Sequence, residues 1–180
     1  MQVIKTKIPG LLILKPAVFK DERGYFFETF NQVKLSGSGI DLNFKQDNES
    51  KSGKHVLRGL HFQAPPFAQG KLVRVVKGAV LDVAVDLRPE SQTYGQWESL
   101  ELNEENKWMY WIPPGFAHGF LSLHEGTILV YKCTEVFNKE TERSIIWNDP
   151  TLNISWGIHK PIVSERDRLA PTFKELKNPF

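Results

Sequence analysis

The sequence predicts an all-β fold, either an antiparallel β-sandwich or a closed β-barrel, with short peripheral helices. Composition favours it, because 12% of the 180 residues are aromatic and 11 prolines leave few stretches with the period of a helix. Spacing favours it too. Short apolar runs recur along the chain, separated by clusters of Pro, Gly, Asn and Glu. Short strands at close spacing are typical of sandwiches and barrels.

The most regular strand pattern lies in residues 71–87. After a glycine turn at Gly78, apolar side chains at every second position alternate with Asp82 and Asp86. This alternation predicts a half-buried strand with both aspartates opposite the apolar face. Similar runs predict further strands at residues 97–102, 108–112, 127–137 and 144–147.

Helical patterns are confined to residues 31–36 and 171–176, and both helices are expected at the periphery. No internal repeat, low-complexity linker or shift in composition divides the chain. A chain of this length buries about two-thirds of its unfolded surface on folding. We therefore expect one domain that spans residues 1–180.

Composition and charge exclude several classes of protein. Lysine and arginine exceed aspartate and glutamate by only two, and the charges are interleaved, so no nucleic-acid partner is expected. No stretch approaches the roughly 20 apolar residues of a membrane span, and the run at 8–14 lacks a signal-peptide cleavage site. Cys133 is the single cysteine, which excludes an intrachain disulfide. We expect a cytoplasmic protein without a membrane partner.

Two histidines lie within apolar strand-like segments. His61 follows the polar stretch that begins at Gln46, and His118 leaves a tight Pro-Gly turn. Alone, each is most simply a core or surface histidine. Two imidazoles in a barrel also suggest a metal, and the segment around His118 resembles the second motif of the cupin superfamily. Metal-binding cupins place a second histidine where this chain has Gln63, so too few ligands remain and no metal is predicted.

Without a metal, the side chains in these segments suit proton transfer beside a carbonyl group. That reaction needs a base, a donor that stabilises the enolate oxygen, and an acid on the opposite face. His61, Lys71 and Tyr131 have the right chemical types for these roles. A solvated lysine and a core tyrosine remain the structural alternatives, because spacing alone does not bring the three side chains together.

Nearly the whole chain resembles the dTDP-4-dehydrorhamnose 3,5-epimerase family. No single motif is decisive, but their joint order is specific. The matching segments are FKDERGYFFETFN at 19–31, QDNESKS at 46–52, VLRGLHFQ at 56–63, QGKLVRVVKG at 69–78, DVAVDLR at 82–88, TYGQW at 93–97, IPPGFAHGF at 112–120, YKCT at 131–134 and SERD at 164–167.

The resemblance implies a cupin-type jelly roll that works as a homodimer without cofactor or metal. It implies a dTDP-sugar substrate, dTDP-4-dehydro-6-deoxy-D-glucose, inverted at C3 and C5. His61 resembles the proton acceptor and Tyr131 the proton donor of the family. Asp167 resembles the carboxylate that pairs with the histidine, and Lys71 the cation that stabilises the enolate oxygen.

The resemblance also implies a set of contacts to the sugar and the pyrophosphate. They fall on Arg23, Glu28, Gln46, Asp47, Asn48, Arg58, Lys71, His118, Glu142 and Arg166. A guanidinium fork suits the paired oxygens of a pyrophosphate. The alternatives are a surface ion pair between Arg23 and Glu28, and solvated side chains at Glu142 and Arg166.

Two positions depart from the family pattern. At Phe137 many members have a tyrosine that stacks on thymine, and phenylalanine keeps the aromatic face without the hydroxyl. At Arg166 the family often has lysine. Related activities remain open, namely a 3-monoepimerase or a 3,4-ketoisomerase, as do a metal-dependent cupin and a non-catalytic sugar-nucleotide binding protein. Product stereochemistry and isotope exchange distinguish these alternatives.

Overall fold

The computed structural model describes residues 1–37, 40 and 43–180. In chain order the elements are β1 (Gln2–Lys5), β2 (Leu12–Lys15), β3 (Val18–Asp21), β4 (Gly24–Phe27), α1 (Gln32–Ser36), β5 (Gln46–Ser52), β6 (Leu57–Gln63), β7 (Lys71–Lys77), β8 (Ala79–Asp86), β9 (Trp97–Asn103), β10 (Met109–Ile112), β11 (Phe116–Ser122), β12 (Thr127–Cys133), β13 (Glu142–Ser144) and α2 (Glu165–Arg168). No described helix is long and apolar enough to cross a membrane.

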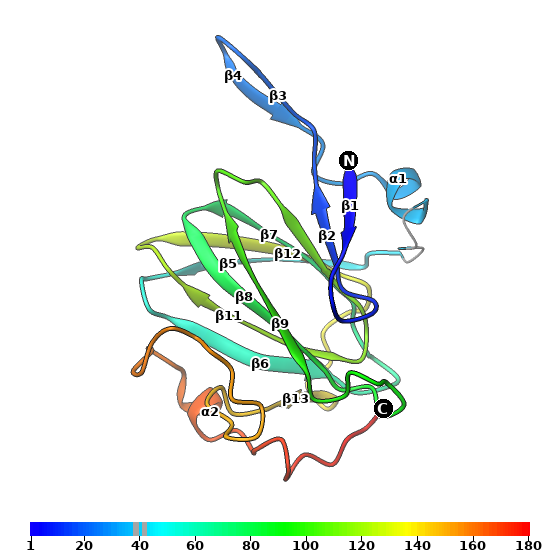
Figure 1. The fold of residues 1–180 in the computed structure, drawn as a ribbon, viewed down its shortest axis with the longest axis vertical. Coiled ribbons are helices and arrows are strands. Elements are labelled where there is room, and N and C mark those ends of the chain that lie inside the picture. Colours follow the sequence, from blue (N-terminus) through cyan, green and yellow to red (C-terminus); the bar gives the residue numbers. More distant parts are fainter. Residues whose placement is uncertain (38–39, 41–42) are drawn as a thin grey trace.

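Two antiparallel sheets form the body of the molecule (Figure 1). One has the strand order β1-β2-β10-β7-β12-β5, and the other has the order β13-β6-β11-β8-β9. Most neighbouring strands within a sheet are distant in sequence, as in a jelly roll, rather than joined as consecutive hairpins. The predicted all-β, cupin-type jelly roll is therefore confirmed.

The main core lies between the two sheets. Val73 on β7, Val80 on β8, Tyr110 on β10 and Phe120 on β11 are among its buried residues. Since successive side chains of a strand point to opposite faces, each strand that contributes here also has an outer face to cover.

A second core covers the outer face of the five-stranded sheet. Segments after β13 contribute Ile145 and Trp156, which pack against the same cluster as Val83 and Val85 of β8. Figure 1 shows this C-terminal part of the chain, in orange and red, running along β6. Strand β8 is therefore buried on both faces, and the prediction that it is half-buried was wrong.

Several predicted boundaries also change. The strand expected at 127–137 ends at Cys133, and the one expected at 144–147 is Glu142–Ser144, because the Ile146 N–H donates to the carbonyl of Pro171 instead. Residues 171–176 form a turn rather than a helix. The helix near the C-terminus is α2, with Ser164 as its N-cap.

The helix expected at 31–36 is confirmed as α1. Asn31 caps it, and its side-chain oxygen accepts a hydrogen bond from the Lys34 N–H. Leu35 on this helix joins a third buried cluster with Leu72 and Met109, which covers part of the outer face of the six-stranded sheet.

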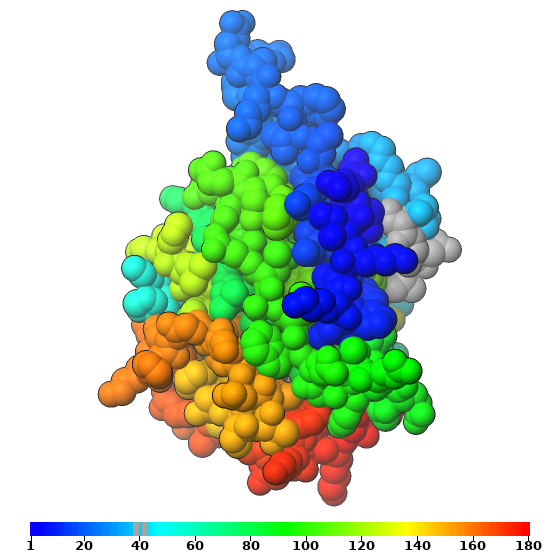
Figure 2. Space-filling view, in the orientation of Figure 1, coloured from blue at the N-terminus to red at the C-terminus, as the bar shows by residue number. Residues whose placement is uncertain are grey.

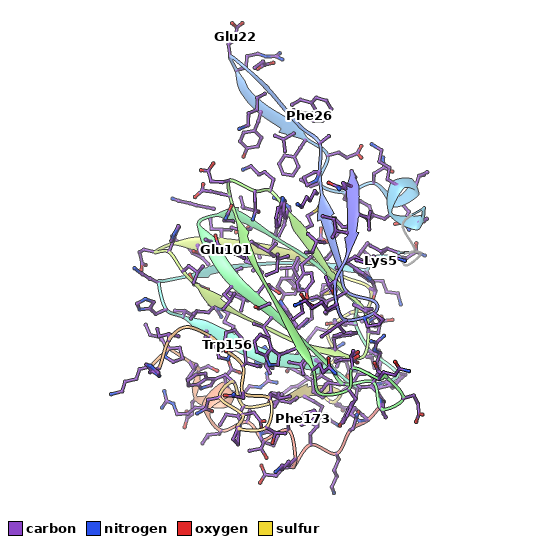
Figure 3. The ribbon with its side chains drawn as sticks, viewed as in Figure 1. Lys5, Glu22, Phe26, Glu101, Trp156 and Phe173 are labelled. Carbon is purple, nitrogen blue, oxygen red and sulfur yellow. The ribbon has the colours of Figure 1, made fainter. Side chains whose placement is uncertain are left out.

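The β3–β4 hairpin projects from the body (Figures 1 and 2). Its ladder is paired with neither of the two large sheets. Phe19, Tyr25 and Phe26 on it are exposed, and Phe26 retains 70% of its accessible surface. Figure 3 places Glu22 at the tip of the hairpin and Phe26 along it. Three exposed aromatic rings on one projecting element are unusual for a surface that faces only water.

Candidate active site

A cavity with two chambers opens between the two sheets, and strands of both sheets line it. The small chamber, about 320 Å³, and the large chamber, about 600 Å³, share four lining residues. These are Asn48 on β5, His61 on β6, Lys71 on β7 and Tyr131 on β12. The base, cation and acid predicted from the sequence therefore lie together, where the two chambers meet.

His61 forms a close pair with Asp167. The Nε2 atom of His61 lies 2.6 Å from Oδ1 of Asp167, whose side chain is 4% exposed. Burial by itself would raise the pKa of Asp167, but the hydrogen bond to His61 and the other contacts outweigh it and hold the pKa below its ordinary value. An ionised carboxylate only accepts hydrogen bonds, so Nε2 of His61 carries the proton. The nitrogen left free to act as a base is Nδ1.

Two backbone features hold Asp167 in place. Its own N–H donates to the Oγ of Ser164 at the start of α2, over 3.1 Å. Its Oδ2 accepts a weaker bond from the N–H of Gly59, at 3.4 Å. Helix α2 thereby holds the Asp167 carboxylate against β6, between the backbone of Gly59 and the side chain of His61.

Lys71 lies within the barrel rather than in solvent. Its Nζ donates to the carbonyl oxygen of His61 at 3.5 Å and lies 5.9 Å from the ring centroid of Tyr131. Burial lowers the pKa of Lys71, with Cys133, Asp82 and Glu142 acting in the opposite direction. A poorly solvated ammonium interacts strongly with a negative charge that develops nearby.

Tyr131, the predicted proton donor, lines both chambers. Its strand lies between β5 and β7, where it faces Asn48 and Val73. Burial raises the pKa of Tyr131, so the phenol keeps its proton at neutral pH. The alternative of a solvated lysine does not describe Lys71, whose ammonium is desolvated by burial. Tyr131 packs against the main core, as the alternative of a core tyrosine holds, and it also lines both chambers.

His118 lies directly opposite His61 on the neighbouring strand β11. The two strands approach closely because both carry a glycine there. A Cβ atom added to Gly59 would lie 2.5 Å from the Cα of Gly119. His118 lines the large chamber, and its Nε2 bonds to the buried carboxylate of Asp82.

A loop after β12 presents Phe137 at the small chamber, where the residue is 53% exposed. Gln46 accepts a hydrogen bond from the Phe137 N–H at 2.7 Å. Gln63 accepts one from the Asn138 N–H at 2.6 Å and donates to the carbonyls of Phe67 and Val136. The glutamine that replaces a cupin metal ligand thus holds a loop.

Within the described ranges, no three His, Cys, Asp or Glu side chains are arranged to hold a metal ion.

Charged side chains line both chambers. Arg58 lines the large chamber and donates to Ser52 Oγ and to the carbonyl of Lys51. Arg166 of the large chamber and Glu142 of the small chamber form an ion pair at 2.7 Å. Glu142 is therefore mostly buried in a pair with Arg166, whose side chain is still 52% exposed.

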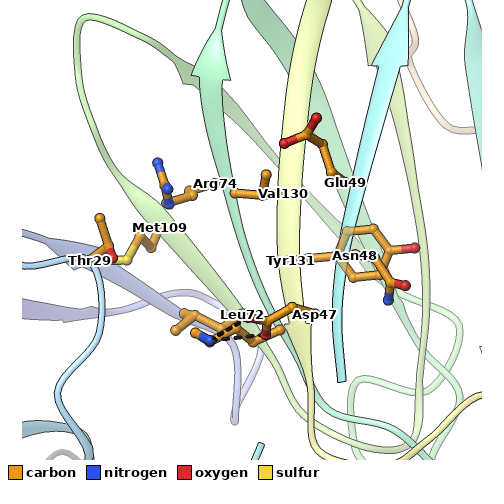
Figure 4. Close-up of a pocket in the computed structure, with 10 residues that line it drawn as sticks. Thr29, Asp47, Asn48, Glu49, Leu72, Arg74, Met109, Val130 and Tyr131 are labelled. Carbon is orange, nitrogen blue, oxygen red and sulfur yellow. Dashed lines mark hydrogen bonds and ion pairs between the residues drawn. The ribbon is translucent and has the colours of Figure 1, made fainter. Parts of the chain in front are cut away.

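Three predicted contacts lie outside the two chambers. Asp47 points to the outer face of β5, where it pairs with Lys132 (Figure 4), because it alternates with the inward-facing Gln46 and Asn48. Arg23 bonds to Asp21 and Glu28 bonds to Lys34, and neither side chain lines a chamber. The alternative of an ion pair between Arg23 and Glu28 was also wrong.

Other residues, which were not predicted from the sequence, also line or support the large chamber. Ser50 and Phe120 line it, and Asp82 supports His118 from below. The Oγ of Ser50 is buried without a hydrogen-bond partner within the described structure. Ser50 has the same strand parity as Gln46 and Asn48, so period-two counting is a signal that finds it.

A histidine–carboxylate dyad, a buried lysine and a protonated tyrosine around one cavity in a jelly roll define an acid–base isomerase. The sequence profile described as dTDP-4-dehydrorhamnose 3,5-epimerase matches residues 5–175 of the chain. The chain belongs to the dTDP-4-dehydrorhamnose 3,5-epimerase family.

Individual relatives agree with this family. The dTDP-4-dehydrorhamnose 3,5-epimerase of Salmonella typhimurium is 53% identical over 173 residues, which cover 95% of this chain and 94% of that protein. The crystal structure of dTDP-6-deoxy-D-glucose-3,5-epimerase from Legionella pneumophila, in complex with dTDP-4-keto-L-rhamnose, superposes with a TM-score of 0.94 at 44% identity. That match covers 97% of this chain and 94% of the other.

A related activity occurs on the same fold. The structure of ChmJ, a 3'-monoepimerase from Streptomyces bikiniensis in complex with dTDP-quinovose, superposes with a TM-score of 0.87 at 34% identity. The match covers 93% of this chain and 85% of that chain. The fold alone therefore does not decide how many carbons are inverted.

Proposed function

We propose that the protein converts dTDP-4-dehydro-6-deoxy-D-glucose to dTDP-4-dehydro-L-rhamnose by inverting C3 and C5, in dTDP-L-rhamnose biosynthesis and without a cofactor. The observation that carries the proposal is the meeting of the His61–Asp167 dyad, Lys71 and Tyr131 in one cavity. Residues 1–180 act as one catalytic domain, and the single cysteine suits a cytoplasmic location.

The reaction is a stepwise enolisation. The C4 carbonyl acidifies the protons on C3 and C5, and Nδ1 of His61 removes one of them. The ammonium of Lys71 stabilises the enolate oxygen, and the phenol of Tyr131 delivers a proton to the opposite face of the same carbon. Solvent then takes the proton from His61 and restores the one lost by Tyr131, after which the sequence repeats at the second carbon.

The charges around His61 support its role as the base. Asp167 stabilises the imidazolium that forms when Nδ1 gains a proton, and it holds the ring in one orientation. Asp167 does not take up the proton itself. Lys71 contributes most when negative charge reaches the substrate oxygen, because burial has removed much of its own hydration.

The remaining chamber residues bind the substrate. Phe137 stacks on thymine at the small chamber, and Arg58 and Arg166 pair with the pyrophosphate. Gln46, Asn48, Glu142 and His118 position the sugar and the nucleotide within the two chambers. Asp47 contacts the substrate only through its backbone, because its side chain lies on the outer face of β5.

We propose further that the protein is a homodimer in which the β3–β4 hairpin contacts the partner. An isolated two-stranded hairpin is marginally stable in water, and this one exposes Phe19, Tyr25 and Phe26. A second copy that buries these rings would also bring Arg23 and Glu28 near the partner's cavity, where the family resemblance gives them a role in binding. One protomer by itself does not bring them there.

Proton NMR of the substrate in D₂O tests the proposed activity, with a reductase present to trap the product. Deuterium at both C3 and C5, together with an L-rhamno product, supports the double epimerase. His61→Asn serves as the control, and its turnover should fall by about 10²- to 10⁴-fold while dTDP binding persists. Turnover close to that of the wild type in this variant would show that His61 is not the catalytic base.

A 3-monoepimerase is the second candidate. The similarity to a 3'-monoepimerase favours it, as does Phe137, which lacks the hydroxyl of the tyrosine frequent at this position. Deuterium confined to C3 with one inversion identifies this activity. A shifted carbonyl in the product identifies a 3,4-ketoisomerase, and no exchange at all identifies a binding protein.

A further inference from the structure

A second histidine–carboxylate pair lies beneath the large chamber. Nε2 of His118 is 2.9 Å from both carboxylate oxygens of Asp82. Asp82 is fully buried and His118 is 6% exposed. Nothing in the proposed proton transfers uses Asp82, yet a buried carboxylate is costly unless a specific partner compensates it.

The geometry decides which nitrogen of His118 carries the proton. An ionised Asp82 only accepts hydrogen bonds, so the proton between the two groups belongs to Nε2 of the ring. Burial lowers the pKa of His118, although Asp82 opposes this effect, and Lys71 and His61 lower it further. A neutral ring with a proton on Nε2 has a lone pair on Nδ1.

The Nδ1 atom of His118 is open to the chamber. In the described part of the chain, no protein group bonds to it, and it is not among the buried side-chain atoms that lack a partner, which are Ser50 Oγ and Tyr110 Oη. The ring lines the large chamber opposite His61. The exposed edge of the ring is therefore a hydrogen-bond acceptor directed at a ligand.

We propose that Asp82 is a positioning residue that holds His118 in its Nε2–H tautomer, so that Nδ1 accepts a hydrogen bond from a hydroxyl group of the bound hexose. The inference rests on the proposed function, because it needs a hexose in the large chamber. It assigns His118 to a donor group of the sugar, and therefore not to the pyrophosphate or to the carbonyl oxygen, which are acceptors.

The two dyads thus differ in purpose. His61 has a side chain 29% exposed and makes a single short bond to Asp167, so it can gain and release a proton through solvent. His118 is almost enclosed and shares Nε2 between two oxygens. An imidazolium there would be poorly solvated, which makes His118 a fixed acceptor and a poor second base.

The first test is ¹⁵N NMR of the wild-type protein with labelled histidine. His118 is assigned by comparison with His118→Gln. We expect a proton on Nε2 and none on Nδ1 at neutral pH, both in the free protein and in the complex with dTDP-L-rhamnose. A proton on Nδ1 in either state overturns the proposal, whether or not the protein proves to be an epimerase.

The second test compares ligands with and without a hexose in Asp82→Asn. Asparagine keeps the shape but both donates and accepts, so it no longer imposes one tautomer on His118. We expect dTDP-L-rhamnose to bind about tenfold more weakly, as for the loss of one hydrogen bond, and dTDP to bind as in the wild type. For the substrate, KM should rise while kcat changes little.

Asp86→Asn is the matched control. Asp86 lies on the same strand and is equally buried, but it bonds to Arg88, Ser91 and Thr93 and lines neither chamber. We expect it to leave the binding of both ligands unchanged. Equal weakening of dTDP and dTDP-L-rhamnose by Asp82→Asn, or the same selectivity in Asp86→Asn, would overturn the role of Asp82. Absence of deuterium exchange in the wild type would instead reject the epimerase function.

Discussion

At the residue scale, the roles of the two histidines depend on which nitrogen is free. In both rings Nε2 bonds to a buried carboxylate, Asp167 for His61 and Asp82 for His118. Nδ1 is therefore the atom of each ring available to the substrate. The surroundings then separate the roles, since the side chain of His61 is 29% exposed and that of His118 only 6%.

Tyr131→Phe should separate proton exchange from inversion. His61 still removes the substrate proton in this variant, and Lys71 still stabilises the enolate, but no acid delivers a proton to the opposite face. We expect deuterium to enter the substrate with retention of configuration, while inversion falls by about 10²- to 10⁴-fold. Proton NMR of the recovered substrate in D₂O measures both quantities.

Tyr110→Phe is the control for this prediction. Tyr110 is fully buried in the core between the sheets, and its hydroxyl has no partner within the described structure. Loss of the Tyr110 hydroxyl should leave both the deuterium exchange and the inversion of the substrate unchanged. It should not destabilise the fold, because this buried hydroxyl is unpaired. Normal inversion in Tyr131→Phe would assign the acid to another group.

At the element scale, the site depends on the close contact of β6 with β11. Gly59 has a φ of +135° and leaves no room for a Cβ atom beside Gly119, while its N–H reaches Asp167. Gly59→Ala should lower the free energy of unfolding by about 3 kcal/mol or more, because backbone strain and a clash with backbone atoms add together. Urea denaturation measures the change.

Gly157→Ala separates these two contributions. Gly157 also has a positive φ, +72°, but an added Cβ atom would meet nothing within 4 Å. We expect a cost of about 1 kcal/mol from backbone strain alone. Similar losses in the two alanine variants would mean that β6 and β11 can separate without cost.

The β3–β4 hairpin carries the prediction about association. Phe26→Ser removes an exposed ring from each hairpin. If a partner buries that ring, the dimer of the variant should dissociate at higher protein concentration than the wild-type dimer. The substrate KM should also rise, because Arg23 is no longer held at the partner's cavity. Sedimentation velocity over a dilution series measures the first effect and steady-state kinetics the second.

Leu169→Ser is the matched control for the hairpin, because Leu169 is 74% exposed and lies far along the chain, after α2. It should leave the dissociation concentration unchanged. A wild-type protein that is monomeric at micromolar concentration would contradict the dimer outright.

At the scale of the whole molecule, acid stability should depend on Asp86. Burial alone would raise the pKa of Asp86, but hydrogen bonds from Arg88, Ser91 and Thr93 lower it from 3.8 to about 2. Because the folded-state pKa is depressed, the stabilisation is complete above the unfolded value and disappears as the pH falls toward about 2. The amount lost is on the order of 2 kcal/mol.

Asp86→Asn should remove this pH dependence. The variant should be less stable than the wild type at neutral pH, and the difference between the two free energies of unfolding should shrink as the pH falls below 3.8. Urea denaturation of both proteins across that range gives the difference directly. A gap that stays constant down to about pH 2 would mean that Asp86 is not held by its hydrogen bonds.

Local patterns in the sequence determined the fold class and the chemical types in the site. Period-two runs between turn residues predicted β8, β9 and β10 to within a residue or two, because alternation and turn chemistry act over short stretches of chain. The side-chain chemistry of His61, Lys71 and Tyr131, namely imidazole, amine and phenol, indicated proton transfer. Their roles came from the family resemblance, and spacing alone did not bring them together.

Tertiary structure decided what covers each strand and which distant groups meet. The second face of β8 is buried only because the C-terminal segment packs on Val83 and Val85. Asp82 lies on the other face of β8, with Val80 and Ala84, where it meets His118 of the neighbouring strand β11. Asp167 reaches His61 from 106 residues away. Such contacts depend on how the sheets are covered and connected, and the local period of a strand carries no information about them.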